Sequence, residues 1–558
     1  MGKRKKNTGS AGGLREADSN ALRAEKPVAA KREHKLPEEE DSRASWLAGA
    51  WVMLMFALFP LIFTDHYFNI LQTKDVTFIV LALLLAVGMG IVYLDGGRKF
   101  RPLGSREDLN RADLSVLAFF GIALIATLLS GKFWFQALTG IDGRFVGLFY
   151  IALITASYFI VSRNLRFSGK YLTVFLAVGL LVCLLGYTDF YNMDLLGFRT
   201  EMLPEQYAMF MSTFGNVNTY TTYVGLVVGV SGALFTLSEE KTGHLVFYYL
   251  VYLVAMLALI TGASDNGYLS LAGFFGALPF VAFRSRKGRA RYLLLFATML
   301  LVIDYLTGVS ISKAGKVIPL YGLFLVIGKL PGLPVIGAVL GILALVLLYR
   351  EKGKEAVRSP HATLWLRGYA VLLILALLAL IGLFVYANSL PYETVHAKFG
   401  MLGDYLKFRN EWGTFRGYVW RATLDEYSKL PILNRIFGSG PDTYVGYMVT
   451  NRWNEMNRIA GQFYDAAHNE YLQYLFTVGP FGLLAHLGIL VFSVRAAFSK
   501  ARALRERQDG SLPREYSAYL YALGIAVICY AFQAFVNINV PVAAPVLWAL
   551  LAVARAAE

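Results

Sequence analysis

The chain has 558 residues, and its composition is that of a membrane protein. Hydrophobic residues make up 56% of it and charged residues only 16%, whereas a soluble domain is ~45–50% apolar and about a quarter charged. The net charge of +15 does not indicate nucleic-acid binding, because the basic residues lie between apolar runs, where they set membrane topology. Both cysteines, Cys183 and Cys529, lie inside apolar runs, which argues against a disulfide framework.

Residues 1–45 predict a disordered cytoplasmic tail. They are rich in charges of both signs, and no aromatic residue precedes Trp46. The first apolar run begins near Trp46, which is too late for the hydrophobic region of a cleavable signal peptide.

Apolar stretches then follow one another along the chain, and each is long enough, or nearly so, for a helix of ~20 residues across a ~30 Å hydrocarbon core. They lie near 46–64, 76–94, 114–130, 146–162, 171–187, 217–237, 245–262, 266–283, 291–308, 333–349, 367–386, 478–495, 517–536 and 540–556. The prolines around 317–332 predict a re-entrant or interfacial piece there. The pattern predicts an all-α, polytopic membrane bundle of about 12–14 transmembrane helices with one large folded extracytoplasmic loop.

The distribution of basic residues predicts the orientation. With the N-terminus inside, the inside loops hold dense clusters such as 284–291 and 495–514, and the short outside loops hold few basic residues. Both termini are therefore expected in the cytoplasm.

One connection is much longer than the others. It divides the chain into a bundle at 46–386, a large extracytoplasmic loop at 387–467 and C-terminal membrane helices at 468–558. The loop contains several tryptophans, a Gly-Ser-Gly-Pro turn at 438–441 and a predicted helix at 415–429. Long ordered loops usually carry function, although a passive cap on the bundle is the alternative.

Common catalytic signatures are missing from the sequence. There is no Gly-x-Gly-x-x-Gly opening a helix, no Walker lysine loop, no His-Glu-x-x-His and no Gly-x-Ser-x-Gly. An Asp-x-Asp pair is also absent from the predicted outside face. We therefore expect an enzyme here to use no cofactor, no nucleotide and no tightly bound metal.

Arginines are the outside residues best suited to bind phosphate. A guanidinium group binds phosphate oxygens as a fork and stays charged at any relevant pH. The alternatives are contacts with ordinary lipid headgroups or ion pairs with Asp142 or Glu201. The candidates are Arg144, Arg199, Arg416 and Arg421.

His468 stands where the large loop ends and the next helix begins. A neutral imidazole there suits a general base near pH 7, and a solvated histidine at a helix start is the alternative. Its neighbour Asn469 is placed either to fix the imidazole tautomer or to cap the helix. Asn216 and Asn218 precede another span, where they cap the helix or bind glycan.

Taken together, these residues resemble the O-antigen ligase and polymerase superfamily of bacteria, over roughly 110 to 550. Gly143-Arg144-x-x-Gly147 resembles the family's Arg-x-x-Gly segment, and 213–218 its Gly-Asn-x-Asn segment. Arg416, Trp420 and the glycine pair at 438–440 resemble its large-loop pattern. His468-Asn469-x-x-Leu472 resembles its His-Asn signature.

The resemblance implies a metal-independent, inverting membrane glycosyltransferase of the GT-C class in the bacterial cytoplasmic membrane. It implies transfer of a glycan from undecaprenyl diphosphate to the hydroxyl of a glycan or lipid acceptor, by ligation or polymerisation, with membrane lipids and no nucleic acid as further partners. His468 is then the candidate base, and Arg144, Arg199 and Arg416 are candidates for holding the diphosphate. One departure is visible: many relatives carry Ser-Arg-Gly where this chain has residues 262–267 without arginine.

Two other functions remain open on the sequence. A transporter or flippase of lipid-linked sugars would carry charged residues within its spans, and the predicted spans are nearly free of them, with Asp304 as an exception. A relative of the cell-shape peptidoglycan polymerases would use an essential loop carboxylate, for which Asp404, Asp442 and Asp465 are available.

Overall fold

The computed structural model describes residues 42–96, 108–353, 360–506 and 514–558. These residues form one compact unit, Asp41–Glu558. The predicted tail at 1–45 lies outside the described residues except for its last four, which belong to the first helix.

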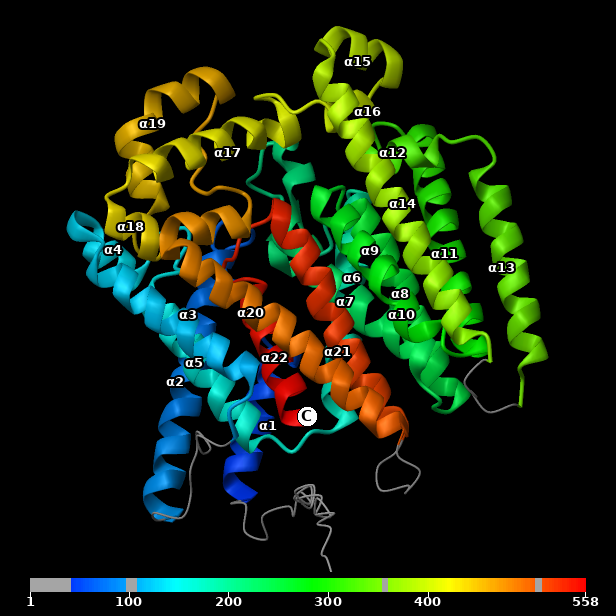
Figure 1. The fold of residues 1–558 in the computed structure, drawn as a ribbon, viewed down its shortest axis with the longest axis horizontal. Coiled ribbons are helices and arrows are strands. Elements are labelled where there is room, and N and C mark those ends of the chain that lie inside the picture. The colour runs from blue at the N-terminus through cyan, green and yellow to red at the C-terminus, as the bar shows by residue number, and fades with distance from the viewer. Residues whose placement is uncertain (1–41, 97–107, 354–359, 507–513) are drawn as a thin grey trace, which may run out of the picture. The chain divides into compact units, whose positions relative to one another are not determined.

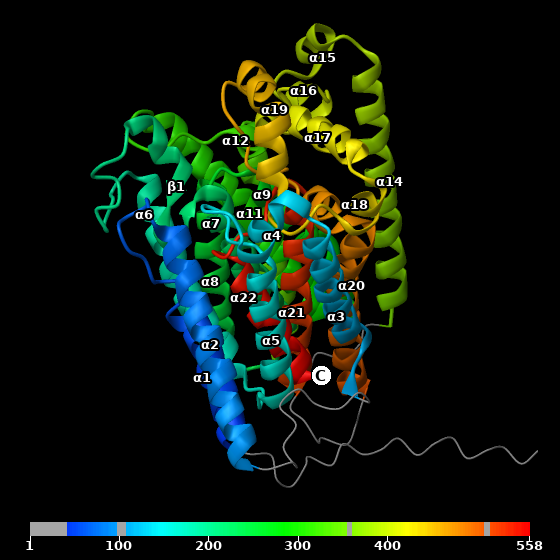
Figure 2. The same ribbon diagram turned by 90° about the vertical axis from the view of Figure 1, so that its left-hand side faces the viewer.

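The described chain is almost entirely helical, and every apolar stretch predicted from the sequence forms a helix (Figures 1 and 2). Ten helices are long and apolar enough to cross a membrane. They are α2 (Ile70–Gly96), α3 (Arg111–Leu128), α6 (Gly169–Phe190), α7 (Val217–Leu237), α8 (Thr242–Thr261), α11 (Arg286–Ser312), α13 (Leu333–Arg350), α14 (Ala362–Ser389), α20 (Glu470–Glu506) and α21 (Arg514–Gln533). The chain is therefore a polytopic all-α membrane protein, as predicted.

The remaining predicted stretches form shorter helices. They are α1 (Ser42–Ala57), α5 (Leu148–Asn164), α22 (Ala544–Ala557), and the pair α9 (Asp265–Ala277) and α10 (Pro279–Ala282), which follow one another directly. The proline-rich region at 317–332 contains only α12 (Gly322–Gly328), whose 7 residues are too few to cross a bilayer.

Short elements connect these helices on the side of the large loop. They are η2 (Gly131–Phe133), α4 (Trp134–Thr139), η3 (Pro204–Met209), η4 (Ser212–Phe214), η5 (Ala534–Val536) and the two-residue strands β1 (Phe210–Met211) and β2 (Gly215–Asn216), which pair antiparallel.

The helix α7 forms the centre of the bundle and is buried along its whole length. It packs against α6, α8, α9 and α21. Its glycines allow this close approach, because a Cβ on Gly229 would lie 2.8 Å from the backbone of Ala526, and one on Gly232 would meet the ring of Phe274 at 2.4 Å. Small residues at helix crossings are the usual device for tight packing in membranes.

The large loop folds into five helices, and two of them share a hydrophobic core with the start of α20. The five helices are α15 (Tyr392–Phe399), α16 (Leu402–Leu406), α17 (Trp412–Lys429), α18 (Ile432–Phe437) and α19 (Tyr444–Ala460). The predicted helix at 415–429 is the regular part of α17, which follows left-handed backbone at 413–415. Val419, Tyr444 and Met448 are buried in this core.

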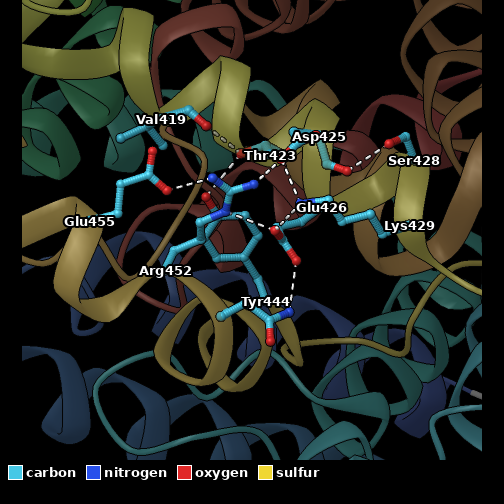
Figure 3. A network of polar contacts seen from close by, with 10 residues as sticks. Val419, Thr423, Asp425, Glu426, Ser428, Lys429, Tyr444, Arg452 and Glu455 are labelled. Atoms are coloured by element: carbon cyan, nitrogen blue, oxygen red, sulfur yellow. Dashed lines mark hydrogen bonds and ion pairs between the residues drawn. The ribbon is translucent and has the colours of Figure 1, made fainter.

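A network of charged side chains joins α17 to α19 (Figure 3). The buried carboxylate of Glu426 accepts hydrogen bonds from Arg452 Nε at 2.7 Å, Asn451 Nδ2 at 2.7 Å and Lys429 Nζ at 3.1 Å. A buried carboxylate with several donors is stable only in a defined geometry, so this loop is an ordered subdomain.

Candidate functional site

The first part of the site is a tight loop at 140–147, between α4 and α5, which carries Arg144. Gly140 and Gly143 adopt φ values of 85° and 82°, which only glycine adopts without strain. A Cβ on Gly147 would lie 2.2 Å from the backbone nitrogen of Gly140. The glycine of the Arg-x-x-Gly segment is therefore required because the two ends of the loop touch.

Asp442, from the large loop, holds this arginine loop in place. Its Oδ2 accepts hydrogen bonds from the backbone N–H of Ile141 at 2.8 Å and of Val146 at 3.3 Å. Its own carbonyl accepts one from Gln136 Nε2 at 2.7 Å. Burial raises the pKa of Asp442 to about 6, and the attraction of Arg144 opposes this shift.

The turn that carries Asp442 is itself fixed on α20. The N–H groups of Ser439 and Gly440 donate to the carbonyls of Phe476 and Thr477 at 3.0 and 2.9 Å. At this point α20 is interrupted by Gly479, whose φ is 69°. The glycine pair noted in the sequence therefore joins the arginine loop to the segment that follows His468.

Arg144 is buried with few partners. Its side chain is 4% exposed, and its Nη1 lies 3.5 Å from Oδ1 of Asp465, which is 48% exposed. Its Nε has no hydrogen-bond partner among the described residues. A buried guanidinium with unused donors is costly, so this group is suited to bind an anion.

Arg416, on α17, reaches the same region from the large loop. Its Nη1 donates to Oδ2 of Asp265 at 2.8 Å and to the carbonyl of Gly413 at 3.0 Å. The side chain is buried, and its Nε also has no partner among the described residues. Asp265 begins α9 in the segment where the family resemblance leads us to expect an arginine, and this chain has a carboxylate there.

His468 is held at the end of the large loop by its neighbours. The indole N–H of Trp420 donates to the carbonyl of Ala467 at 3.0 Å, and the ring of Tyr464 lies edge-on at 5.6 Å from the imidazole. His468 itself adopts a φ of 47°, which is uncommon for a residue with a side chain. This left-handed backbone lies directly before the regular helix that starts at Glu470.

The electrostatic surroundings of His468 show which charged groups share its site. Burial, followed by the charge of Arg416, lowers the pKa of His468, and Arg144 adds to this shift. Asp465 opposes it. The structure therefore brings together Arg144, Arg416 and His468, three residues predicted for the site, and keeps the imidazole neutral around pH 7.

The asparagines have capping and bridging roles. Asn469 Oδ1 accepts from the N–H of Leu472 at 3.1 Å, and Asn216 caps α7 by accepting from the N–H of Asn218 at 2.9 Å. Asn218 accepts the hydroxyl of Ser264 at 2.7 Å, beside Asp265. Asn218 thus supports the segment that binds Arg416, while Asn469 directly follows His468 in the chain.

The other two predicted arginines make their contacts elsewhere. Arg199 is buried and donates to Asn192 Oδ1 at 3.0 Å and to the carbonyl of Asp189 at 3.1 Å. Arg421 is exposed, with its guanidinium 5.0 Å from the ring centre of Phe408. Neither contact involves Arg144, Arg416 or His468.

A buried polar network inside the bundle was not predicted. Glu470 accepts from the hydroxyl of Tyr530 at 2.7 Å and from Asn539 Nδ2 at 3.4 Å, and Nε2 of His486 lies 3.4 Å from its Oε1. The sequence predicted that the next helix begins near His468 and that its apolar stretch begins near Val478, and α20 begins at Glu470. No sequence signal marks these partners: Tyr530 is on α21, Asn539 lies between η5 and α22, and His486 is on α20 itself.

Comparison with protein families identifies the region that contains most of this site. Residues 317–487 match the family model described as O-antigen ligase. The chain contains an O-antigen ligase domain. The matched residues include Arg416, Asp442, Asp465 and His468, whereas Arg144 and Asp265 approach them from earlier helices.

The O-antigen ligase domain confirms the family resemblance seen in the sequence, and it indicates glycan transfer in general as the activity. A search of the curated proteins found no match to the chain.

Proposed function

We propose that the protein transfers a glycan from undecaprenyl diphosphate to an acceptor hydroxyl at the outer face of a bacterial cytoplasmic membrane, as a ligase or polymerase. The observation that carries the proposal is that the short segment before His468 contacts both arginine-bearing elements: Asp465 lies 3.5 Å from Arg144, and Tyr464, which packs on His468, donates to the carbonyl of Thr414 beside Arg416. Most of these residues lie in the O-antigen ligase domain.

The two arginines suit the diphosphate of such a donor. Guanidinium groups form bidentate, charge-assisted hydrogen bonds with phosphate oxygens. Both side chains are buried and keep unused donors, so an anion gains attraction there without first removing water from them. The same charges stabilise the diphosphate as it leaves, when its negative charge increases.

His468 suits the role of general base. Its lowered pKa keeps the imidazole neutral, which is the form that accepts a proton. In the proposed step His468 takes the proton of the acceptor hydroxyl, whose oxygen forms a bond to C1 of the donor sugar. The bond between C1 and the diphosphate oxygen breaks, its electrons leave with the diphosphate, and the configuration at C1 inverts.

No metal is needed in this scheme, because the lipid diphosphate already activates C1 and the arginines compensate its charge. Metal independence is part of the proposal, and it is tested by adding a chelator.

The deciding experiment is a transfer assay with purified protein in lipid. It supplies an undecaprenyl diphosphate-linked oligosaccharide without nucleotide or metal, and compares His468→Ala and Arg416→Ala with Arg421→Ala, a matched control on the same helix outside the cluster. We expect the first two variants to lose activity by about a hundredfold or more and Arg421→Ala to stay near wild type.

Products separate the two forms of the proposed reaction. Longer chains from donor alone establish a polymerase, and transfer only to an added lipid or glycan acceptor establishes a ligase. Full activity of His468→Ala contradicts the proposed base. Inactivity of the wild type with several donors contradicts glycan transfer and favours transport of lipid-linked sugars.

A further inference from the structure

The helix α14 is unlike the other spans, because its middle has no packing partner. Every residue from Ile374 to Tyr386 is exposed. A run of this length covers all faces of a helix several times, since one turn takes ~3.6 residues. The exposure therefore includes the face that is turned toward the bundle.

Both ends of α14, by contrast, are attached. At one end the hydroxyl of Tyr369 donates to the carbonyl of Phe275 on α9 at 2.8 Å. At the other, Asn388 Nδ2 donates to the carbonyl of Leu406 on α16 at 2.8 Å. Figures 1 and 2 show α14 at the edge of the bundle, rising from α10 toward α16. The helix α14 is thus attached to the protein at both ends, and an opening lies between its unpacked middle and the rest of the bundle.

The periodicity of α14 identifies its inner face. Tyr369 and Leu373 are partly buried, and residues spaced by three or four positions share their face. Leu377 and Leu380 continue this stripe, yet they are 57% and 58% exposed. Because the hydrocarbon region of a bilayer leaves no empty space beside apolar side chains, lipid chains must fill the opening.

The opposite wall of the opening leads to the candidate site. It is formed by α9, whose exposed Ala272 lies one turn from Gly276, a second acceptor of the Tyr369 hydroxyl. The ring of Phe532, beside Gly273, is also exposed. The other end of α9 is Asp265, which binds Arg416.

We propose that the opening between α14 and α9 binds the polyisoprenoid chain of the lipid-linked donor, with its diphosphate at Arg416 and Arg144. This inference rests on the proposed function and adds the site for the lipid part of the substrate. The continuity of the α9 wall with the Asp265–Arg416 pair is the reason for choosing this occupant over a bulk phospholipid or a second copy of the chain. The free segment of α14 spans ~20 Å at 1.5 Å per residue, a length that suits a long chain rather than a short one.

Site-specific photo-crosslinking tests the proposal without requiring turnover. Benzoylphenylalanine is placed at Leu377 or Leu380 on the inner face, and at Leu375 or Leu378 on the outer face as matched controls, in a His468→Ala background. The probes are radiolabelled undecaprenyl diphosphate and radiolabelled phosphatidylethanolamine in the same vesicles. We expect undecaprenyl adducts at the inner positions to exceed those at the outer positions by about tenfold, and phosphatidylethanolamine adducts to be similar at all four.

Three outcomes overturn the proposal. They are equal undecaprenyl labelling of both faces, the same inner-face preference for phosphatidylethanolamine, and adducts between two copies of the protein in place of lipid adducts. Since the assay measures binding only, a failure of glycan transfer in the wild type leaves its result interpretable.

A second variant gives an independent measurement. Leu380→Trp narrows the opening, and Leu378→Trp adds the same side chain to the outer face. We expect Leu380→Trp to raise the KM for the undecaprenyl-linked donor about tenfold and to leave the KM for a donor with a two-isoprene chain unchanged. An equal effect on both donors contradicts a role of the opening in binding the chain.

Discussion

At the scale of single residues, Asp442 decides whether Arg144 is in place. One oxygen of its carboxylate accepts both N–H groups that fix the arginine loop. The Asp442→Asn variant keeps a side-chain oxygen that accepts these bonds, whereas the Asp442→Ala variant does not. We expect Asp442→Ala to lower kcat/KM between about tenfold and a hundredfold, because small displacements of binding groups are costly in catalysis, and Asp442→Asn to keep most of the activity.

Transfer assays on the two variants check this, together with the affinity for undecaprenyl diphosphate. If Asp442→Ala binds the diphosphate as well as wild type does, the proposed positioning of Arg144 is wrong. A loop that is only structural would affect folding yield and leave the affinity of the folded fraction unchanged.

The pH dependence of transfer follows from the same groups. Burial raises the pKa of Asp442 to about 6, so its charge, which attracts Arg144, is lost as the pH falls through this value. The pKa of His468 is shifted down, which places its protonation outside this range. Because the uncharged Asp442→Asn is expected to keep most of the activity, we expect kcat/KM of wild type to fall by only about two- to threefold below about pH 6, to the level of Asp442→Asn, and this decline to be absent in Asp442→Asn.

The contribution of Asp442 to the free energy of unfolding changes with pH in the direction opposite to the change in activity. The folded pKa of Asp442 is above its ordinary value of 3.8, so between about pH 4 and 6 the folded state binds more protons than the unfolded state. Its contribution to the free energy of unfolding therefore decreases as the pH rises through this window. Loss of activity without unfolding below about pH 6 thus separates the effect on the site from acid denaturation.

The sequence predicted Arg144, Arg416 and His468 as site residues because each belongs to a motif with a fixed order. It could not separate them from Arg199 and Arg421, since all lie on the predicted outer side and share the same chemistry. It also gave no sign of the partnership between Asp265 and Arg416, because these residues are far apart in sequence and meet only through the packing of the large loop on α9.

At the scale of elements, the arginine loop needs its glycines for two different reasons. A glycine is needed at 147 because the backbone of Gly140 leaves no room for a side chain. At 143 there is open space for a side chain, and glycine is needed only because the backbone has a positive φ. We expect Gly147→Ala to destabilise the loop by several kcal/mol, since the backbone must move, and Gly143→Ala to cost about 1 kcal/mol.

Thermal unfolding in detergent and the transfer assay measure both effects. A Gly147→Ala protein with wild-type activity would contradict the close contact between the ends of the loop. Equal losses for the two variants would assign the requirement to backbone conformation alone.

The folded loop depends on the buried Glu426 between α17 and α19 (Figure 3). We expect Glu426→Ala to cost about 2 kcal/mol or more, because it leaves Arg452 without its buried partner. Asp425→Ala, which removes an exposed partner of the same arginine, is the control, with an expected cost below about 1 kcal/mol.

Hydrogen exchange of the amides in α17 and α19 measures the difference. Faster exchange in both variants, or in neither, would show that Glu426 does not hold the two helices together. Because Arg416 and Trp420 lie on α17, we expect loosening of this pair to reduce transfer as well.

The apolar runs located the helices correctly because a span must be apolar along its length. The start of α20 at Glu470 agrees with the predicted end of the large loop, but the buried partners of Glu470, Tyr530 and Asn539, could not be predicted because they are far from it in the sequence. The sequence likewise does not show that the middle of α14 lies apart from the bundle, because an apolar helix that faces lipid and one that is packed inside a bundle have similar sequences.

At the scale of the whole molecule, a second buried carboxylate ties together the helix ends opposite the large loop. Asp113 on α3 accepts from Tyr158 OH at 2.9 Å and Arg163 Nη2 at 2.6 Å on α5, and from Arg555 Nε at 3.1 Å on α22. The first and last parts of the bundle are thereby joined at one end, while the large loop lies at the other (Figure 2). The site forms only when early helices and the late loop assemble together.

The proposed orientation of the bundle gives the last prediction. The charge distribution predicts that the termini lie in the cytoplasm, and the proposed substrate is exposed on the outer face. Ser428 is exposed in the large loop and Ser499 is exposed near the far end of α20. In a protein whose native cysteines are buried, we expect Ser428→Cys to react with a membrane-impermeant maleimide in intact cells and Ser499→Cys to react only after lysis.

The physical reason is that α20 crosses the membrane between the two positions, since it runs from Glu470 beside His468 to Glu506. Labelling of Ser499→Cys in intact cells, with Ser428→Cys protected, would place His468 and the arginines on the cytoplasmic side. The donor would then have to be used before it crosses the membrane, and glycan transfer at the outer face would be contradicted even if the purified protein were active. Labelling at Ser428→Cys alone puts the base, the arginines and the outer end of the α14 opening on the side where a flipped lipid-linked glycan is exposed.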